Sequence, residues 1–188
     1  MMSTVTSVLR AIAGRCLVAV LIVCAQLLEP DAARASVQAD PLVTRATFVS
    51  RPPVLDGGLD DDVWTGAPVV SEFRQRDPQE GSPATERTRV RIIYDKARLY
   101  IGVELDDGEP SAIRASELRR DDPLDSDDSF AVLLDTYLDH RNAFLFRVNG
   151  RGTRFDALIR NESRTLDATW DEEWAAAAAI TERGWTVE

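Results

Sequence analysis

Residues 88–105 read TRVRIIYDKARLYIGVEL and carry the clearest structural signal in the chain. Every second residue from Leu99 to Leu105 is aliphatic, and an alternation with a period of two is typical of a strand with one buried face. The run Thr88–Tyr94 is rich in Val, Ile and Tyr, and the mainly charged residues Asp95–Arg98 separate it from the second run. We therefore expect a β-hairpin here.

Similar short runs, separated by turn residues, recur along the chain. Further candidate strands are Val43–Val49, Val69–Phe73, Ser129–Asp135, Ala143–Asn149 and Arg154–Arg160. Short strands at this spacing predict an all-β fold, a two-sheet antiparallel β-sandwich. One short helix is expected near the N-terminus at residues 59–64, because Leu59 and Val63 are one helical turn apart and acids fill the first turn.

Two features near the C-terminus need interpretation. The five alanines Ala175–Ala179 have high helix propensity, but they precede the turn Glu182–Gly184 and a Trp185-Thr-Val run. We interpret them as a strand of a hairpin, with a helix as the alternative. The sequence stops at Glu188 within an apparent strand, so we expect a sandwich that is incomplete at its C-terminus and belongs to a longer protein.

The first 35 residues have the pattern of a secretory signal peptide. Arg10 and Arg15 precede the apolar run Cys16–Leu28, and Ala33-Arg34-Ala35 fits a cleavage site. A membrane anchor is the alternative, although about 13 apolar residues are too few for a typical spanning helix. The expected organisation is a leader at 1–35, a linker or first strand at 36–47 and the sandwich at 48–188, exported to the periplasm, the cell surface or the medium.

Charge and cysteine content narrow the class of protein further. The 188 residues carry 22 basic and 32 acidic side chains, a net charge of −10. Loss of the leader leaves 19 basic and 30 acidic residues and a net charge of −11. Such a chain is not expected to bind nucleic acid, which requires a clustered positive surface. Both cysteines, Cys16 and Cys24, lie in the leader, so the exported protein is expected to form no disulfide.

The sequence offers few candidates for catalytic residues. The single histidine, His140, lies in a predicted turn, and no nucleophile-elbow, P-loop or zinc-protease motif is present. Glycoside hydrolysis uses a pair of carboxylates. With 30 acidic residues after loss of the leader, such a pair is expected by chance and does not indicate an enzyme. We therefore expect a non-catalytic domain.

Two groups of residues are candidates for binding. Asp125, Asp127 and Asp128 are closely spaced in one loop, and their carboxylate oxygens are ligands that calcium prefers. The alternative is a solvated acidic loop that binds no metal. Aromatic rings pack against sugar rings, and Trp170, flanked by acids after a polar loop, is the most plausible exposed platform. Trp64 and Trp185 are expected in the core, and Trp174 leans the same way.

The order of several motifs resembles a family 9 carbohydrate-binding module. These motifs are PVLDG at 53–57, LDDDVW at 59–64, VRIIYD at 90–95 with LYIGV at 99–103, DDSFAVLLD at 127–135 and FRVN at 146–149. The resemblance covers nearly all of 48–188. It implies an exported β-sandwich that binds polysaccharide or oligosaccharide chains, contains structural calcium and is often attached to O-glycosyl hydrolases of carbohydrate catabolism. A bacterial subgroup in which such a domain precedes an outer-membrane-barrel-like region is the closest likeness.

The family's binding residues transfer only in part. Leu124 stands at the position of a sugar-stacking Trp, and Phe130 at that of a sugar-binding Glu. Arg147 matches the family's Arg, with pairing to a nearby acid as the alternative, and Asn149 of the same motif is a further candidate. Sequence alone thus predicts Arg147, Asn149 and Trp170 for carbohydrate and Asp125, Asp127 and Asp128 for calcium. The alternative function is a structural periplasmic or surface domain of an outer-membrane protein that binds no sugar.

Overall fold

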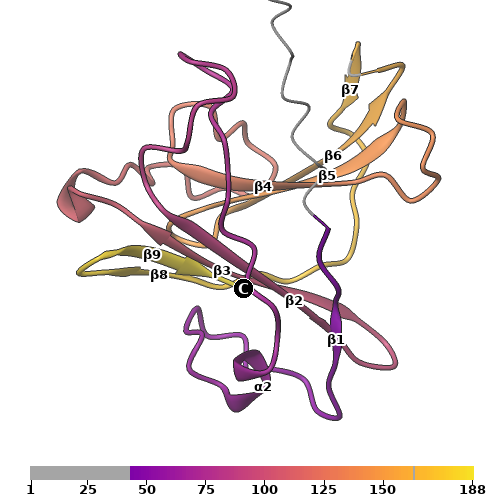
Figure 1. The fold of residues 1–188 in the computed structure, drawn as a ribbon. Coiled ribbons are helices and arrows are strands. Elements are labelled where there is room, and N and C mark those ends of the chain that lie inside the picture. The colour runs from indigo at the N-terminus through magenta and orange to yellow at the C-terminus, as the bar shows by residue number, and fades with distance from the viewer. Residues whose placement is uncertain (1–42, 163) are drawn as a thin grey trace, which may run out of the picture. The chain divides into compact units, whose positions relative to one another are not determined.

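The computed structural model describes residues 43–162 and 164–188, so the predicted signal peptide and most of the linker lie outside the described residues. The described chain is almost entirely β-structure, arranged in two sheets as in a β-sandwich (Figure 1). The expectation of an all-β, two-sheet fold is therefore confirmed. No helix among the described residues has the length and apolarity needed to cross a membrane.

The first sheet has five strands in the order β1-β2-β3-β9-β8. Its strands are β1 (Thr47–Phe48), β2 (Thr88–Tyr94), β3 (Leu99–Asp106), β8 (Ala178–Thr181) and β9 (Gly184–Val187). The predicted β2–β3 hairpin is confirmed, with Thr88 opposite Leu105 and Tyr94 opposite Leu99. β9 continues the sheet beside the second half of β3, from Val103 to Asp106.

The second sheet has four antiparallel strands in sequence order. They are β4 (Ser129–Leu134), β5 (Ala143–Asn149), β6 (Arg154–Arg160) and β7 (Thr165–Asp167). Residues opposite each other in neighbouring antiparallel strands share a face. The pair Val132–Phe146 therefore lies on one face of this sheet, and the pair Ala131–Arg147 lies on the other.

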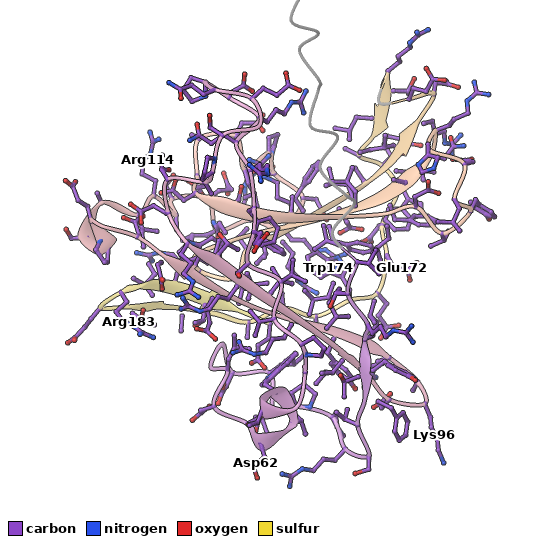
Figure 2. All side chains as sticks on the ribbon, in the orientation of Figure 1. Asp62, Lys96, Arg114, Glu172, Trp174 and Arg183 are labelled. Carbon is purple, nitrogen blue, oxygen red and sulfur yellow. The ribbon has the colours of Figure 1, made fainter. Side chains whose placement is uncertain are left out.

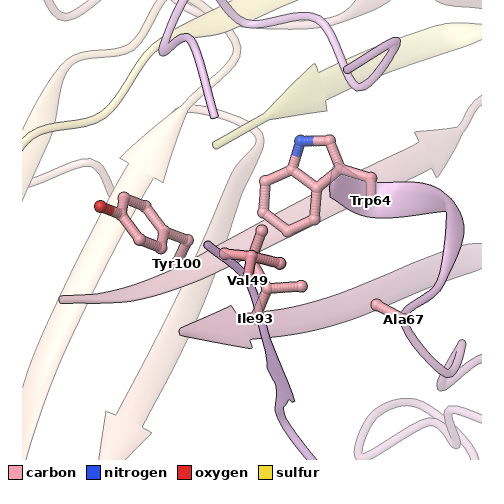
Figure 3. Packing of buried hydrophobic residues seen from close by; sticks show 5 residues of the cluster. All are labelled: Val49, Trp64, Ala67, Ile93 and Tyr100. Atoms are coloured by element: carbon pink, nitrogen blue, oxygen red, sulfur yellow. The ribbon is translucent and has the colours of Figure 1, made fainter. Parts of the chain in front are cut away.

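The short helix α2 (Asp62–Thr65) covers the outer face of the five-stranded sheet (Figure 3). Trp64, predicted to be a core residue, is 2% exposed and packs with Val49, Ile93 and Tyr100. A Cβ on Gly102 would come within 3.0 Å of the Trp64 ring. Glycine in β3 thus permits the close approach that buries the indole.

Some local predictions differ from the structure. Instead of a strand at 43–49, only the two residues of β1 pair, and the expected strand at 69–73 is reduced to an isolated bridge between Val70 and Val90. The alanine run forms a strand only from Ala178, and the alanines before it have no regular structure. β7 was not expected; with three residues it is too short to show an alternating pattern.

Candidate ligand-binding site

The outer face of the four-stranded sheet carries two of the three predicted carbohydrate residues. Arg147 lies on β5, and all three of its guanidinium nitrogens donate hydrogen bonds within the protein. Their acceptors are Ser129 Oγ at 2.8 Å, Asp125 Oδ1 at 2.9 Å and the Leu124 carbonyl at 2.8 Å. The pairing with a nearby acid that sequence analysis left open is therefore present.

Asn149 occupies a fully buried position at the end of β5. Its amide nitrogen donates to the Glu117 carbonyl at 2.9 Å and to Asp127 Oδ2 at 2.8 Å. Its oxygen accepts the amides of Arg151 and Thr153, both at 3.0 Å. With four hydrogen bonds and no exposure, Asn149 joins the loop before β4 to the β5–β6 turn.

The loop at 113–128 covers the part of this face formed by β5 and β6. Leu124 has no exposed surface and packs against Phe155, Ala157 and Leu145. This is the position at which the resembling family has a stacking tryptophan; here the side chain points into the protein. Direct access to the outer face is therefore blocked at Leu124 and Asn149.

The three predicted calcium ligands lie in this loop, and each accepts hydrogen bonds from the protein. Asp128 accepts the Arg114 amide at 2.8 Å, while Asp125 pairs with Arg147. Burial acts to raise the pKa of Asp127, but hydrogen bonds from the Ser116 amide and hydroxyl, the Glu117 amide and Asn149 outweigh it and hold the pKa well below its usual range. Within the described part of the chain, no group of three or more potential ligands converges as a metal site. Calcium binding stays a prediction.

The inner faces of the two sheets border a cleft of about 880 Å³. β3 contributes Leu99, Ile101 and Val103, and β4 contributes Phe130, Val132 and Leu134. One wall is the irregular segment that precedes β8, residues 172–176. A concave site with a mainly apolar lining and a few polar groups is the usual form of a small-ligand site.

Trp174 and the two acids before it lie at this wall. Trp174 is half-buried, whereas Glu172 and Glu173 are exposed, and all three line the cleft. Figure 2 shows Trp174 and Glu172 close together between the two sheets. The wall thus combines an aromatic ring with two carboxylates that water reaches.

Aromatic side chains of β5 and of the segment after β7 pack against one another beside this wall. Trp174 contacts Phe146 edge-on, with ring centroids 5.2 Å apart. Trp170 lies 4.9 Å from Phe144 and 5.9 Å from Phe146. The predicted platform Trp170 is therefore half-buried and belongs to an aromatic row, defined as Phe144, Phe146, Trp170 and Trp174.

Asp156 fixes one end of this row. It lies opposite Phe146 on the inner face of β6 and has no exposed surface. Its carboxylate accepts the Trp174 indole N–H at 3.0 Å, the Glu172 amide at 2.8 Å and an Arg120 nitrogen at 3.3 Å. The Arg154 guanidinium lies 5.6 Å from the centre of the Trp174 ring and also donates to the Trp174 carbonyl. The indole is thus held from two sides.

A second buried carboxylate lies on another part of the cleft wall. Glu188 is 8% exposed and accepts the Trp64 indole N–H at 3.1 Å and the Gly57 amide at 3.1 Å. Burial raises the pKa of Glu188, and the three donors around it only partly offset that effect. This carboxylate fastens α2 and the preceding loop to the end of β9.

The sequence-predicted carbohydrate residues do not form one site. Arg147 and Asn149 lie on the outer face of the four-stranded sheet, and Trp170 contacts residues of its inner face. Sequence reasoning missed Asp156, although an aspartate at an inward position of the strand RFDALIR is a recognisable signal. The expectation that Trp174 belongs with the core is confirmed in part, since the half-buried ring packs against the core cluster that contains Val148 and Trp185. That the same ring also lines a cleft is not visible in the local sequence.

Comparisons of the chain with protein-family models, with curated proteins and with solved structures found no match.

Proposed function

We propose that this protein is an exported, non-catalytic carbohydrate-binding domain similar to the family 9 modules. The observation that carries the proposal is the cleft wall where half-buried Trp174 adjoins the exposed carboxylates Glu172 and Glu173. Sugar rings have apolar C–H faces and hydroxyl edges, so an aromatic ring beside hydrogen-bond acceptors suits them.

The aromatic row supports a chain ligand rather than a single ring. Phe146 contacts both Trp174 and Trp170, so the aromatic row extends beyond one indole. A second sugar unit next to one bound at Trp174 would lie near Trp170. We therefore propose oligosaccharide or polysaccharide as the ligand.

The fixed indole supports binding without a large rearrangement. Asp156 and Arg154 already hold Trp174, so little side-chain entropy remains to be lost when a ligand arrives. The surroundings of the acids support a non-catalytic role, because the carboxylates of Asp156 and Glu188 already accept hydrogen bonds from indole and amide groups. His140 is 91% exposed in the β4–β5 turn, which does not favour a catalytic role for it either.

Isothermal titration with xylan and cello-oligosaccharides, with and without calcium, tests this proposal. Trp174→Ala should weaken binding about tenfold or more, because loss of a central aromatic contact typically costs around 2 kcal/mol. Tyr137→Ala is a matched control: it removes an aromatic ring that is 77% exposed in the β4–β5 turn. Absence of heat and of fluorescence change with every glycan would reject the proposal.

A structural domain that packs on an outer-membrane protein is the second candidate. It is favoured by the internal hydrogen bonds of Arg147 and Asn149, which occupy the polar groups that the sequence predicted for carbohydrate binding. This candidate predicts that no glycan binds and that cross-linking in cells joins the domain to one envelope protein in the absence of polysaccharide. Glycan binding that Trp174→Ala abolishes would reject it.

A further inference from the structure

The free edge of β4 is an unusual surface for a β-protein. β4 is the edge strand of its sheet, and within the described ranges the only strand that pairs with it is β5. Its sequence, SFAVLL, is six residues long and carries no charge and no proline. Exposed strand edges are normally protected by charge, proline, a bulge or short length, because unpaired N–H and C=O groups recruit further strands.

The other three edge strands fit that rule better. β1 has two residues, β7 has three and ends at Asp167, and β8 has four. β4 is the longest of the edge strands and exposes Leu133 at 55% and also Ala131. Its composition thus favours association at this edge.

The side chains of β4 are complementary to themselves. Phe130, Val132 and Leu134 point to the cleft, while Ala131 and Leu133 point to the outer face. In an antiparallel pair of two β4 strands related by a twofold axis at Val132, each Phe130 lies opposite a Leu134 and each Ala131 opposite a Leu133. Every pair joins two apolar side chains on the same face, and all five apolar residues of the strand are used.

We propose that this edge is a self-association surface: two copies of the chain pair antiparallel through β4 to form a continuous eight-stranded sheet. The second copy would extend the apolar floor of the cleft beyond Phe130 and Leu134, which are only half-buried in a single copy. A strand of six residues is about 20 Å long, so the contact is small. The dimer should therefore be weak, mainly monomeric at ~1 µM and mainly dimeric at ~200 µM.

Two double variants of the full chain test the interface and its register together. Ala131→Lys with Leu133→Lys places like charges opposite each other across the twofold axis and should abolish the dimer. Ala131→Lys with Leu133→Glu places opposite charges there and should retain it. Both variants alter only exposed side chains of the outer face, and circular dichroism with thermal melting verifies that each variant folds.

Sedimentation velocity between 1 and 200 µM is the measurement. Leu166→Lys is the matched control, since Leu166 is also 55% exposed but lies on β7 at the opposite edge. The expected result is a concentration-dependent dimer for the unaltered chain, the Lys/Glu variant and the control, and a monomer for the Lys/Lys variant. A monomeric unaltered chain, a dimeric Lys/Lys variant or a monomeric Lys/Glu variant would each overturn the proposal.

Discussion

The two faces of the four-stranded sheet differ in what their polar groups contact. On the outer face, Asn149 and Arg147 bond with a loop that covers them. On the inner face, the buried carboxylate of Asp156 bonds with a wall that borders the cleft. The outer network joins parts of the protein to each other, whereas the inner network holds Trp174 at the wall of the cleft. Polar side chains of one sheet thus hold a covering loop on one face and fix the wall of a cleft on the other.

The largest effect should come from the outer face. Asn149→Ala leaves the Arg151 and Thr153 amides without their acceptor and removes one of the donors to the Asp127 carboxylate and to the Glu117 carbonyl. A loss of about 3–5 kcal/mol in the free energy of unfolding is expected, since each unsatisfied buried group costs roughly 1–3 kcal/mol. Urea denaturation measures it, with Asn142→Ala in the β4–β5 turn as the control. A loss below ~1 kcal/mol would show that the outer network does not hold the loop.

A smaller loss is expected on the inner face. Asp156→Ala removes the acceptor of the Trp174 indole and the Glu172 amide, but Arg120 keeps its contacts with Asp171 and Asp121. Roughly 2–3 kcal/mol should be lost, together with the near-ultraviolet circular dichroism of Trp174. A stable variant with unchanged tryptophan signals would contradict the role given to Asp156.

Acid should weaken the outer network through Asp127. Its pKa is lowered in the folded protein, so its contribution is fully present above the ordinary carboxyl pKa of about 4 and is lost as the pH falls further. The stability difference between the unaltered chain and Asp127→Asn should therefore be largest at neutral pH and shrink below pH ~4. Asp60→Asn, in the exposed loop before α2, is the control. A difference that stays constant down to pH ~2 would refute this account.

The strands that could be predicted from the sequence are those whose pattern lies within a few neighbouring residues. The β2–β3 hairpin and β4 to β6 follow from alternating side chains and turn residues, which neighbouring residues specify by themselves. β7 exists only because it pairs with β6, and the isolated bridge at Val70 depends on β2. Local patterns cannot supply such long-range pairings.

The candidate site was harder to predict for the same reason. Arg147 and Asn149 were identified by their motif, but nothing in that motif indicates that residues 113–128 fold over them. Trp170 was expected to be exposed, and the aromatic contacts that half-bury it come from β5. Residue type was therefore a poor guide to accessibility.

Calcium should give the smallest effect. Asp125, Asp127 and Asp128 already accept protein hydrogen bonds, so an ion bound there would have to replace them. We expect millimolar calcium to raise the melting temperature by no more than about 1 °C. Differential scanning calorimetry with calcium and with chelator measures the shift. A rise of several degrees that Asp125→Asn removes would instead establish the predicted metal site.

The central claim is that ligand binds on the inner face, at Trp174. Tryptophan fluorescence titration with the oligosaccharide that binds best, applied to the unaltered chain, Trp174→Ala and Arg147→Ala, tests it directly, with calorimetry as a second readout. We predict that Trp174→Ala raises the dissociation constant about tenfold or more, while Arg147→Ala binds as the unaltered chain does. Loss of binding in Arg147→Ala with full binding in Trp174→Ala would contradict the claim and place the site on the outer face.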